Sequence, residues 1–297
     1  SDGGAWRKRT QGTSWYNEAL NTATRGSRRE FPAVAVIVAE AAKVTIYDGD
    51  DPALPMWMVF ETTGIFSGSA YNSVACLNGI LVAGTSDGFG SPFCNFIADF
   101  GLAQLNASAA LARSGAIVDR NLGGSSNPLV SYGAVGTIVN NTVNDVAMTV
   151  LPDAPIDPAT GLPVPTIAVA TDGGVSVIKD DGTVVDATRW AYVGSVAFTD
   201  DLQLIAQGDS SGSNGGKYTE VYDPVTLTDT SSSGDESYRN GGSTVPTTFN
   251  VLTGGGANGY LAPNGSAIGF DVGLCQLDRN PSAPTTGMVA YTTSTYN

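Results

Sequence analysis

The sequence of 297 residues contains no histidine. This absence excludes histidine metal sites, histidine general bases, and the nucleophile systems in which a Ser or Cys depends on a His. Charged residues make up only 14% of the chain, against about 25% in an ordinary soluble domain. No apolar run approaches the roughly 20 residues that a membrane helix needs. We therefore expect no enzyme activity, no catalytic residue, no cofactor or metal ion, and no membrane span.

Cysteine is equally scarce, and its odd number does not suit a disulfide framework. The three residues are Cys76, Cys94 and Cys275. We predict that all three are buried, reduced side chains that act as small hydrophobes in a protein made in a reducing compartment. The chain also opens without Met and without an apolar leader, so we expect no signal peptide and read the sequence as a fragment of a longer protein.

Positive charge is in deficit, with 14 Lys and Arg against 28 Asp and Glu and a net charge of -14. A chain of this charge repels nucleic acid and anionic lipid. Six of the basic residues nevertheless fall within the first 29 positions, interleaved with Trp6, Trp15 and Tyr16, and these six are Arg7, Lys8, Arg9, Arg25, Arg28 and Arg29. The pattern resembles a nucleic-acid arm, but the net charge favours an inter-subunit or inter-domain contact with the acidic remainder.

Turn signals are abundant. The chain has 37 glycines, and both Asn-Gly and Asp-Gly occur five times. These dipeptides are the strongest short-range indicators of a β-hairpin. Strand-turn-strand patterns recur at residues 35–51, 74–88, 167–186, 195–209 and 259–273. Together they predict an all-β, antiparallel protein.

The spacing of these hairpins is roughly 30 to 60 residues, which is typical of β-propeller blades. We predict a single β-propeller-like domain of short antiparallel blades over residues 1–297. Pairing of an N-terminal strand at 3–10 with a C-terminal strand at 287–297 would close the ring and remove a free sheet edge. The alternatives are a β-sandwich or jelly roll and, less favoured, a β-helix.

Few segments favour helix. Residues 106–113 predict a short helix with Asn106 as its N-cap, whereas 144–151 suit either strand or helix. The five prolines of 152–165 indicate an extended connector. Residues 55–60 predict a buried strand, and the Ser-, Gly- and Asn-rich stretches at 208–216 and 229–242 predict surface loops.

Several short motifs allow a functional or a structural interpretation. GTSDG (84–88) and GDSSG (208–212) match a nucleophile elbow, but neither leads into a helix, so we read both as turns. GGGANG (254–259) opens no helix and does not predict a phosphate loop. The turn with Asp48, Asp50 and Asp51 offers calcium ligands, but Val59 stands where an EF-hand needs an acid, and an Asx turn is favoured.

Two further Asp-rich motifs, 172–174 and 180–182, are read as turns in the same way. The first lies within ATDGG (170–174), which distantly resembles the sialidase Asp-box. Propeller glycosidases use paired carboxylates at the centre of the ring. The alternative function is therefore a polysaccharide-active hydrolase, a depolymerase that degrades host surface glycan. Such an enzyme needs acids, aromatics and Arg around one cavity, and the sequence does not locate that cluster.

Three segments, 14–40, 44–60 and 143–182, resemble virion proteins of marine tailed bacteriophages. The resemblance covers about half of the chain and carries no catalytic motif. It implies a tail or fibre component of the virion, assembled in the bacterial cytoplasm, with a scaffold or host-adhesion role. The partners it implies are other copies of the chain, other virion proteins and host surface glycan. Neither nucleic acid nor a membrane is expected as a partner.

Overall fold

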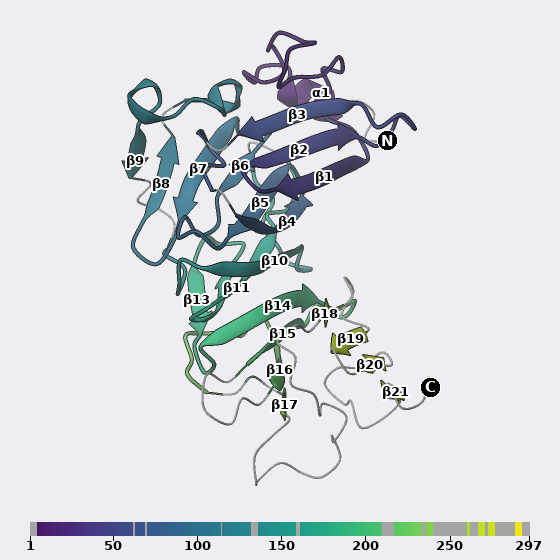
Figure 1. Ribbon diagram of the computed structural model, residues 1–297, viewed down its shortest axis with the longest axis vertical. Coiled ribbons are helices and arrows are strands. Elements are labelled where there is room, and N and C mark those ends of the chain that lie inside the picture. The colour runs from purple at the N-terminus through teal and green to yellow at the C-terminus, as the bar shows by residue number, and fades with distance from the viewer. Residues whose placement is uncertain are drawn as a thin grey trace. The chain divides into compact units, whose positions relative to one another are not determined.

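The computed structural model describes residues 5–61, 63–68, 70–113, 115–131, 136–158, 161–209, 217–232 and 234, and the strands at 236–239, 260–261, 267–270, 273–276 and 289–292. The protein is nearly all β, with 43% strand and 5% helix, so the predicted fold class is confirmed (Figure 1). The chain forms two compact units. Unit 1 comprises residues 1–137 and 154–164, and unit 2 comprises 138–153 and 165–297.

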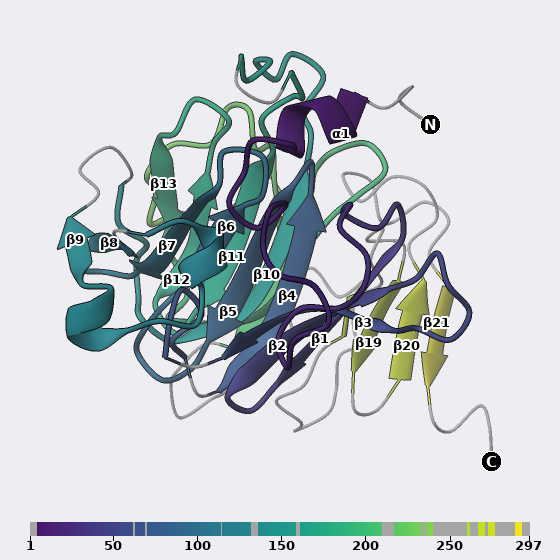
Figure 2. The same cartoon turned by 90° about the horizontal axis from the view of Figure 1, so that it is seen from above.

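Unit 1 contains a short helix, α1 (Ala5–Thr10), and two antiparallel sheets. The first sheet has the order β1-β2-β3, with bounds Ala35–Glu40, Lys43–Asp48 and Met56–Glu61. The second has six strands in sequence order (Figure 2), which are β4 (Tyr71–Leu77), β5 (Ile80–Thr85), β6 (Phe93–Asn95), β7 (Phe100–Leu105), β8 (Ala110–Arg113) and β9 (Leu129–Ser131). Two 3-10 turns, Ile117–Asp119 and Gly124–Ser126, lie between β8 and β9.

Unit 2 contains three four-stranded antiparallel meanders. The first is β10 (Val143–Thr149), β11 (Thr166–Thr171), β12 (Gly174–Ile178) and β13 (Val184–Ala187). The second is β14 (Tyr192–Phe198), β15 (Leu204–Asp209), β16 (Lys217–Tyr222) and β17 (Glu236–Arg239). The third is β18 (Tyr260–Leu261), β19 (Ala267–Phe270), β20 (Gly273–Gln276) and β21 (Val289–Thr292).

Strand register reveals a repeat that the sequence alone did not show. The strands β4, β10 and β14 each have seven residues and a bulge near their start, at Asn72, Asn144 and Gly194. Aligning the bulges superimposes NSVACL (72–77), NDVAMT (144–149) and GSVAFT (194–199). The extra residue at a bulge twists and bends the strand, so the same device recurs at the start of three sheets.

The first strands of neighbouring sheets pack together within each unit. In unit 1 β1 packs beside β4, and in unit 2 β10 packs beside β14 and β14 beside β18. Asn144 donates to the carbonyl of Val193 at 2.9 Å, and the backbone N–H of Val196 donates to Asp145 at 3.0 Å. First strands that lie side by side are what propeller blades require. A closed ring of such blades stays a prediction.

Each unit has its own hydrophobic core. In unit 1 the core is aromatic and includes Trp15, Trp57, Phe60 and Phe96, all at most 1% exposed. In unit 2 the core between the β10–β13 and β14–β17 sheets is built from small and branched side chains, such as Ala168. Small side chains permit close approach of the two sheets, which fits the direct contacts between β10 and β14.

The predicted hairpins form as expected at the described positions. Asn78 and Gly79 connect β4 to β5 with φ angles of 49° and 80°, as a type I′ turn requires. The predicted buried strand at 55–60 is β3, and the ambiguous segment 144–151 lies largely in strand β10. Residues 254–259 lie outside the described residues, as does most of the predicted loop 208–216.

Two predictions of secondary structure are wrong. Residues 5–10 form α1 rather than a strand, so this segment does not pair with a C-terminal strand. Residues 110–113 are strand β8 rather than helix, because Asn106 accepts the N–H groups of Ser108 and Ala109 in an Asx turn. That turn uses the same side-chain chemistry as a helix N-cap.

The cysteines differ in their exposure to solvent. Cys94 is buried and free, as predicted, whereas Cys76 is free but exposed. Cys76 lies on β4, the first strand of its sheet, which explains why the prediction of burial fails there. The side chain of Cys275 is outside the described residues.

Candidate functional site

The basic N-terminal segment is the most distinctive part of the sequence, and the structure shows where its charges lie. Residues 14–30, which we call the N-terminal strap, connect α1 toward the β1–β3 sheet without regular secondary structure. The strap enters the core of unit 1 through Trp15, whose indole N–H donates to the carbonyl of Phe96 at 2.6 Å. Ser14 adds a second anchor, because its N–H and its hydroxyl both donate to Asp99 at 2.7 Å.

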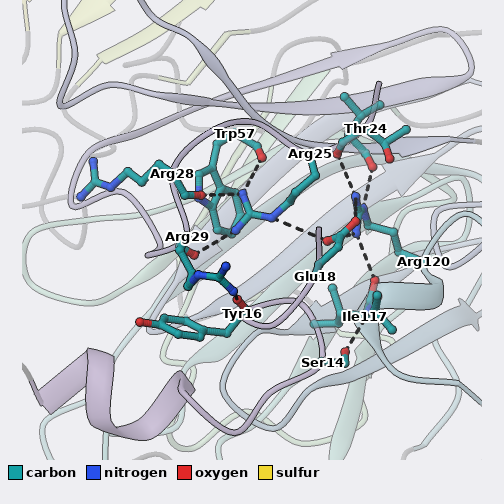
Figure 3. Close-up of polar contacts among 12 residues, drawn as sticks. Ser14, Tyr16, Glu18, Thr24, Arg25, Arg28, Arg29, Trp57, Ile117 and Arg120 are labelled. Carbon is teal, nitrogen blue, oxygen red and sulfur yellow. Dashed lines mark hydrogen bonds and ion pairs between the residues drawn. The ribbon is translucent and has the colours of Figure 1, made fainter. Parts of the chain in front are cut away.

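Arg25 is the central cation of the strap. Its side chain is fully buried and lies 4.5 Å over the ring of Trp57. The guanidinium donates to the carbonyls of Trp57, Arg28 and Arg29 at 2.8 to 2.9 Å and lies 3.6 Å from Glu18 (Figure 3). Burial lowers the pKa of Arg25 to about 10, so the group stays charged at neutral pH. This arginine binds backbone of its own chain.

A second buried arginine, Arg120, completes the cluster. It follows the 3-10 turn Ile117–Asp119 and binds Glu18 through two nitrogens at 2.8 and 3.0 Å. It also donates to the carbonyls of Val59 and Thr24 at 2.8 Å. Glu18 therefore lies between two arginines that are far apart in sequence (Figure 3). No motif surrounds Arg120, and no sequence signal predicted its role.

Arg28 links the strap to the acidic turn that follows β2. It donates to Asp48 at 2.8 Å and to Asp50 at 2.6 Å. Asp50 also accepts the N–H groups of Ala33 and Val34 at 2.9 Å. The hydrogen bonds that Arg28 donates to Asp48 raise the pKa of Arg28, and the hydrogen bond that Asp50 accepts from the N–H of Ala33 lowers the pKa of Asp50. An arginine thus lies where the calcium alternative would place a cation.

Two more of the six basic residues bind within unit 1. Arg7 forms an ion pair with Glu30 at 2.8 Å, and its neighbour Tyr16 raises its pKa. Arg29 donates to the carbonyl of Tyr16 and lies over its ring. Four of the six predicted interface arginines and lysines, counting Arg25 and Arg28, therefore contact groups of their own unit. Contacts to another subunit stay a prediction.

Unit 2 contains a buried anion instead. Glu220, on β16, is fully buried, and its two oxygens accept hydrogen bonds from Trp190 at 2.7 Å, Tyr222 at 2.7 Å and the N–H of Gly234 at 2.8 Å. Arg189 lies 3.8 Å away. Burial, reinforced by the charge of Glu220, raises the pKa of Tyr222 far above its ordinary value. No sequence pattern predicts this cluster, because Trp190 and Gly234 lie 30 and 14 positions from Glu220.

The aromatic and acidic composition of this cluster matches what a glycan-active site would need, but its geometry does not. Trp190 stacks on Tyr218 with ring centroids 4.7 Å apart, so one face of the indole is already occupied. Both oxygens of Glu220 already accept hydrogen bonds from this chain. A carboxylate so enclosed holds segments together rather than exchanging protons with a bound molecule.

The Asp-rich motifs lie in turns, as predicted. Asp172 and Gly173 connect β11 to β12, and Gly182 follows Asp181 with a φ of 85°. Asp181 accepts both the N–H and the hydroxyl of Thr183, and these bonds lower its pKa. GTSDG ends strand β5 in a turn with Gly88 at a φ of 90°.

Within the described residues, no group of three or more His, Cys, Asp or Glu side chains is placed to hold a metal ion. The helices found in that part of the chain are too short or too polar to cross a membrane. Comparison with known proteins adds no assignment: no family model matches the sequence, and no curated protein matches it.

Proposed function

We propose that the chain is a structural component of a tailed-bacteriophage virion, part of a tail or fibre with a scaffold or host-adhesion role. The observation that carries the proposal is how the buried charges are used. Arg25, Arg120 and Glu220 are all at most 1% exposed, and each binds segments of its own unit to a sheet. Buried charges whose hydrogen bonds go to their own unit favour a rigid scaffold over a reaction site.

The resemblance of residues 14–40, 44–60 and 143–182 to virion proteins of marine phages supports the same role. These segments include the strap, the β1–β3 sheet and the first hairpins of unit 2, and they contribute residues to both cores. The proposed partners are other copies of the chain and other virion proteins, with host surface glycan bound by an adhesive surface. The proposed location is the virion.

The test is to find the chain in purified particles. Mass spectrometry of phage particles that encode this sequence, with antibody labelling in electron microscopy, is expected to show the chain at fixed stoichiometry in the tail. Detection only in the soluble fraction of the lysate would overturn the proposal. A multimerised form of the purified chain should also label host cells better than the monomer, because linked weak contacts reinforce one another.

The enzyme alternative has its own readout. We expect purified chain to release no reducing sugar from host envelope polysaccharide on long incubation. Sugar release that disappears in a folded E220Q variant, but persists in E40Q, would favour a hydrolase. Glu40 is a suitable control because its side chain is 47% exposed and pairs only with nearby Lys43 among the ion pairs of the described residues.

A further inference from the structure

The joint between the first two sheets of unit 2 is made by side chains at a strand bulge. On β10 the bulge residue is Asn144, and the next residue is Asp145. The amide of Asn144 donates to the carbonyl of Val193 at 2.9 Å, and Asp145 accepts the N–H of Val196 at 3.0 Å. Val193 and Val196 flank the bulge of β14. The bulge of one first strand therefore holds the first strand of the next sheet.

Ser195 occupies on β14 the position that Asp145 occupies on β10. Each residue directly follows the bulge and pairs with the second strand of its sheet, Asp145 with Ala170 and Ser195 with Gln207. The Ser195 hydroxyl donates to the side-chain oxygen of Gln207 at 3.3 Å. A hydroxyl that donates one hydrogen bond still has lone pairs with which to accept another. Ser195 can therefore accept a backbone N–H, as Asp145 does.

The face of the β14–β17 sheet that carries Ser195 is buried. Gln207 and Thr219 follow Ser195 in one cross-strand row, because directly opposite residues of antiparallel strands share a face. Both are 3% exposed, yet the amide nitrogen of Gln207 and the hydroxyl of Thr219 have no hydrogen-bond partner among the groups that the structure describes. The core shared with the β10–β13 sheet lies on the opposite face, with Phe198 and Ala206. Another element must therefore cover the face of Ser195.

The element available for this face is the third meander of unit 2. Strand β14 packs beside β18, the first strand of that sheet. The sequence at β18, GYLA (259–262), matches GSVA (194–197) at β14 and NDVA (144–147) at β10 in its final Ala and in the aliphatic residue before it. Leu261 therefore has the place on β18 that Val196 has on β14.

We propose that Ser195 accepts the backbone N–H of Leu261, and that the β18–β21 sheet docks on the β14–β17 sheet by the same joint that links β14–β17 to β10–β13. The interaction surface is the row of Ser195, Gln207 and Thr219, and its partner is the next sheet of the same chain. The acceptor is neutral at Ser195 and charged at Asp145, so the second joint should be the weaker one. This inference does not depend on the proposed function.

Amide hydrogen exchange of the full chain tests the joint. We expect Ser195→Ala to speed exchange of the Leu261 amide by about two- to tenfold, because a neutral hydrogen bond is lost. Asp145→Ala calibrates the measurement, since it should speed exchange of the Val196 amide, which donates to Asp145. The matched control is Ser232→Ala, because Ser232 is exposed in unit 2 and should leave both amides unchanged.

Ser195→Asp tests whether the two joints are equivalent. The variant gives β14 the carboxylate that β10 carries, and a charged acceptor binds an N–H more strongly than a neutral one. The carboxylate can also accept the unpartnered amide nitrogen of Gln207 once that amide rotates. Exchange of the Leu261 amide should therefore be at least about threefold slower than in the wild type. Circular dichroism establishes that the variants keep the all-β fold.

The proposal is overturned if Ser195→Ala leaves exchange of the Leu261 amide unchanged, or if Ser195→Asp speeds that exchange as Ser195→Ala does. A Leu261 amide without protection in the wild type would overturn it as well. These results are separate from those that test the proposed function. A chain that is present in phage tails but lacks the joint keeps the structural role, and a chain that has the joint but is absent from particles loses the virion role alone.

Discussion

In unit 1 the buried charged side chains that bind separate segments together are cations, whereas in unit 2 the corresponding side chain is an anion. In unit 1, Arg25 and Arg120 donate to backbone carbonyls and share Glu18. In unit 2, Glu220 accepts hydrogen bonds from Trp190, Tyr222 and a backbone N–H. Removal of the cation leaves hydrogen-bond acceptors without a donor, and removal of the anion leaves hydrogen-bond donors without an acceptor. In unit 1 the buried charge matches backbone carbonyls, and in unit 2 it matches two side-chain donors and one backbone N–H.

The two clusters also differ in how many long-range contacts depend on one side chain. Arg120 binds the strap at two residues, Glu18 and Thr24, and the last strand of the β1–β3 sheet at Val59. Glu220 binds one residue before β14 and one glycine after β16. We therefore expect loss of Arg120 to be the more damaging change.

The largest effect is expected for R120L. The variant leaves Glu18 without its bidentate partner and the carbonyls of Val59 and Thr24 without a donor, which should lower the free energy of unfolding by about 3–5 kcal/mol. Urea denaturation followed by tryptophan fluorescence measures the loss, because Trp15 and Trp57 lie in the same core.

The matched control for R120L is R28L. The side chain of Arg28 is 33% exposed and its partner Asp50 is 29% exposed, whereas Asp48 is 8% exposed and still accepts the N–H of Asp50. Loss of Arg28 should therefore cost less than loss of Arg120, about 1–2 kcal/mol. Equal losses of unfolding free energy in the two variants would show that burial does not determine how much these ion pairs contribute to stability.

A smaller effect is expected for E220Q. The amide keeps one acceptor but replaces the other oxygen with a donor. Because Tyr222 and Gly234 donate to one oxygen of Glu220 and Trp190 donates to the other, either Trp190 or both Tyr222 and Gly234 lose their acceptor, at a cost of about 2–3 kcal/mol. Hydrogen exchange measured by mass spectrometry should locate the loss in unit 2 and leave the peptides of unit 1 unchanged. E40Q, on exposed β1, is the control. A loss confined to unit 1 would contradict the comparison.

Local features of the fold could be predicted from the sequence because their causes are local. The turn at Asn78 and Gly79 depends on two residues with positive φ, and a dipeptide is enough to specify it. The error at residues 106–113 has an equally local cause. Asn106 is suited both to an Asx turn and to a helix N-cap, and only the pairing of β8 with β7 and β9 decides between them.

The site clusters could not be predicted, since their members meet only in the folded chain. Arg120 and Glu18 are 102 positions apart, and no spacing rule links them. The basic segment contacts acidic groups of its own unit, but these partners became visible only when Asp48, Asp50 and Glu18 were placed beside it. An inter-subunit or inter-domain contact of this segment stays a prediction. Sequence patterns report turn chemistry well and long-range charge pairing poorly.

The smallest expected effect concerns Asp186, the partly buried acid on β13, at the sheet edge that residues 229–230 cover. Its carboxylate accepts the hydroxyl of Ser176 at 2.7 Å, and its N–H donates to Asp229 at 2.9 Å. Burial, with a contribution from the charge of Asp229, raises the pKa of Asp186. The folded protein therefore holds this proton more tightly than the unfolded chain. The resulting stability is present at acid pH and is lost as pH rises through the folded pKa.

D186N should therefore stabilise unit 2 slightly at pH 7, by less than about 1 kcal/mol because the carboxylate is partly hydrated, and the gain should vanish near the ordinary pKa of Asp, about 4. D181N on the same sheet is the opposite control. Hydrogen bonds from Thr183 lower the pKa of Asp181, so its ionised form favours the folded state above that pH, and the contribution is lost on acidification. Thermal unfolding of both variants at pH 4 and pH 7 measures whether each substitution raises or lowers the stability of the fold. If D186N were less stable than the wild type at both pH values, the bond from Ser176 would require a carboxylate, and burial of the charge would not be the dominant influence at this edge.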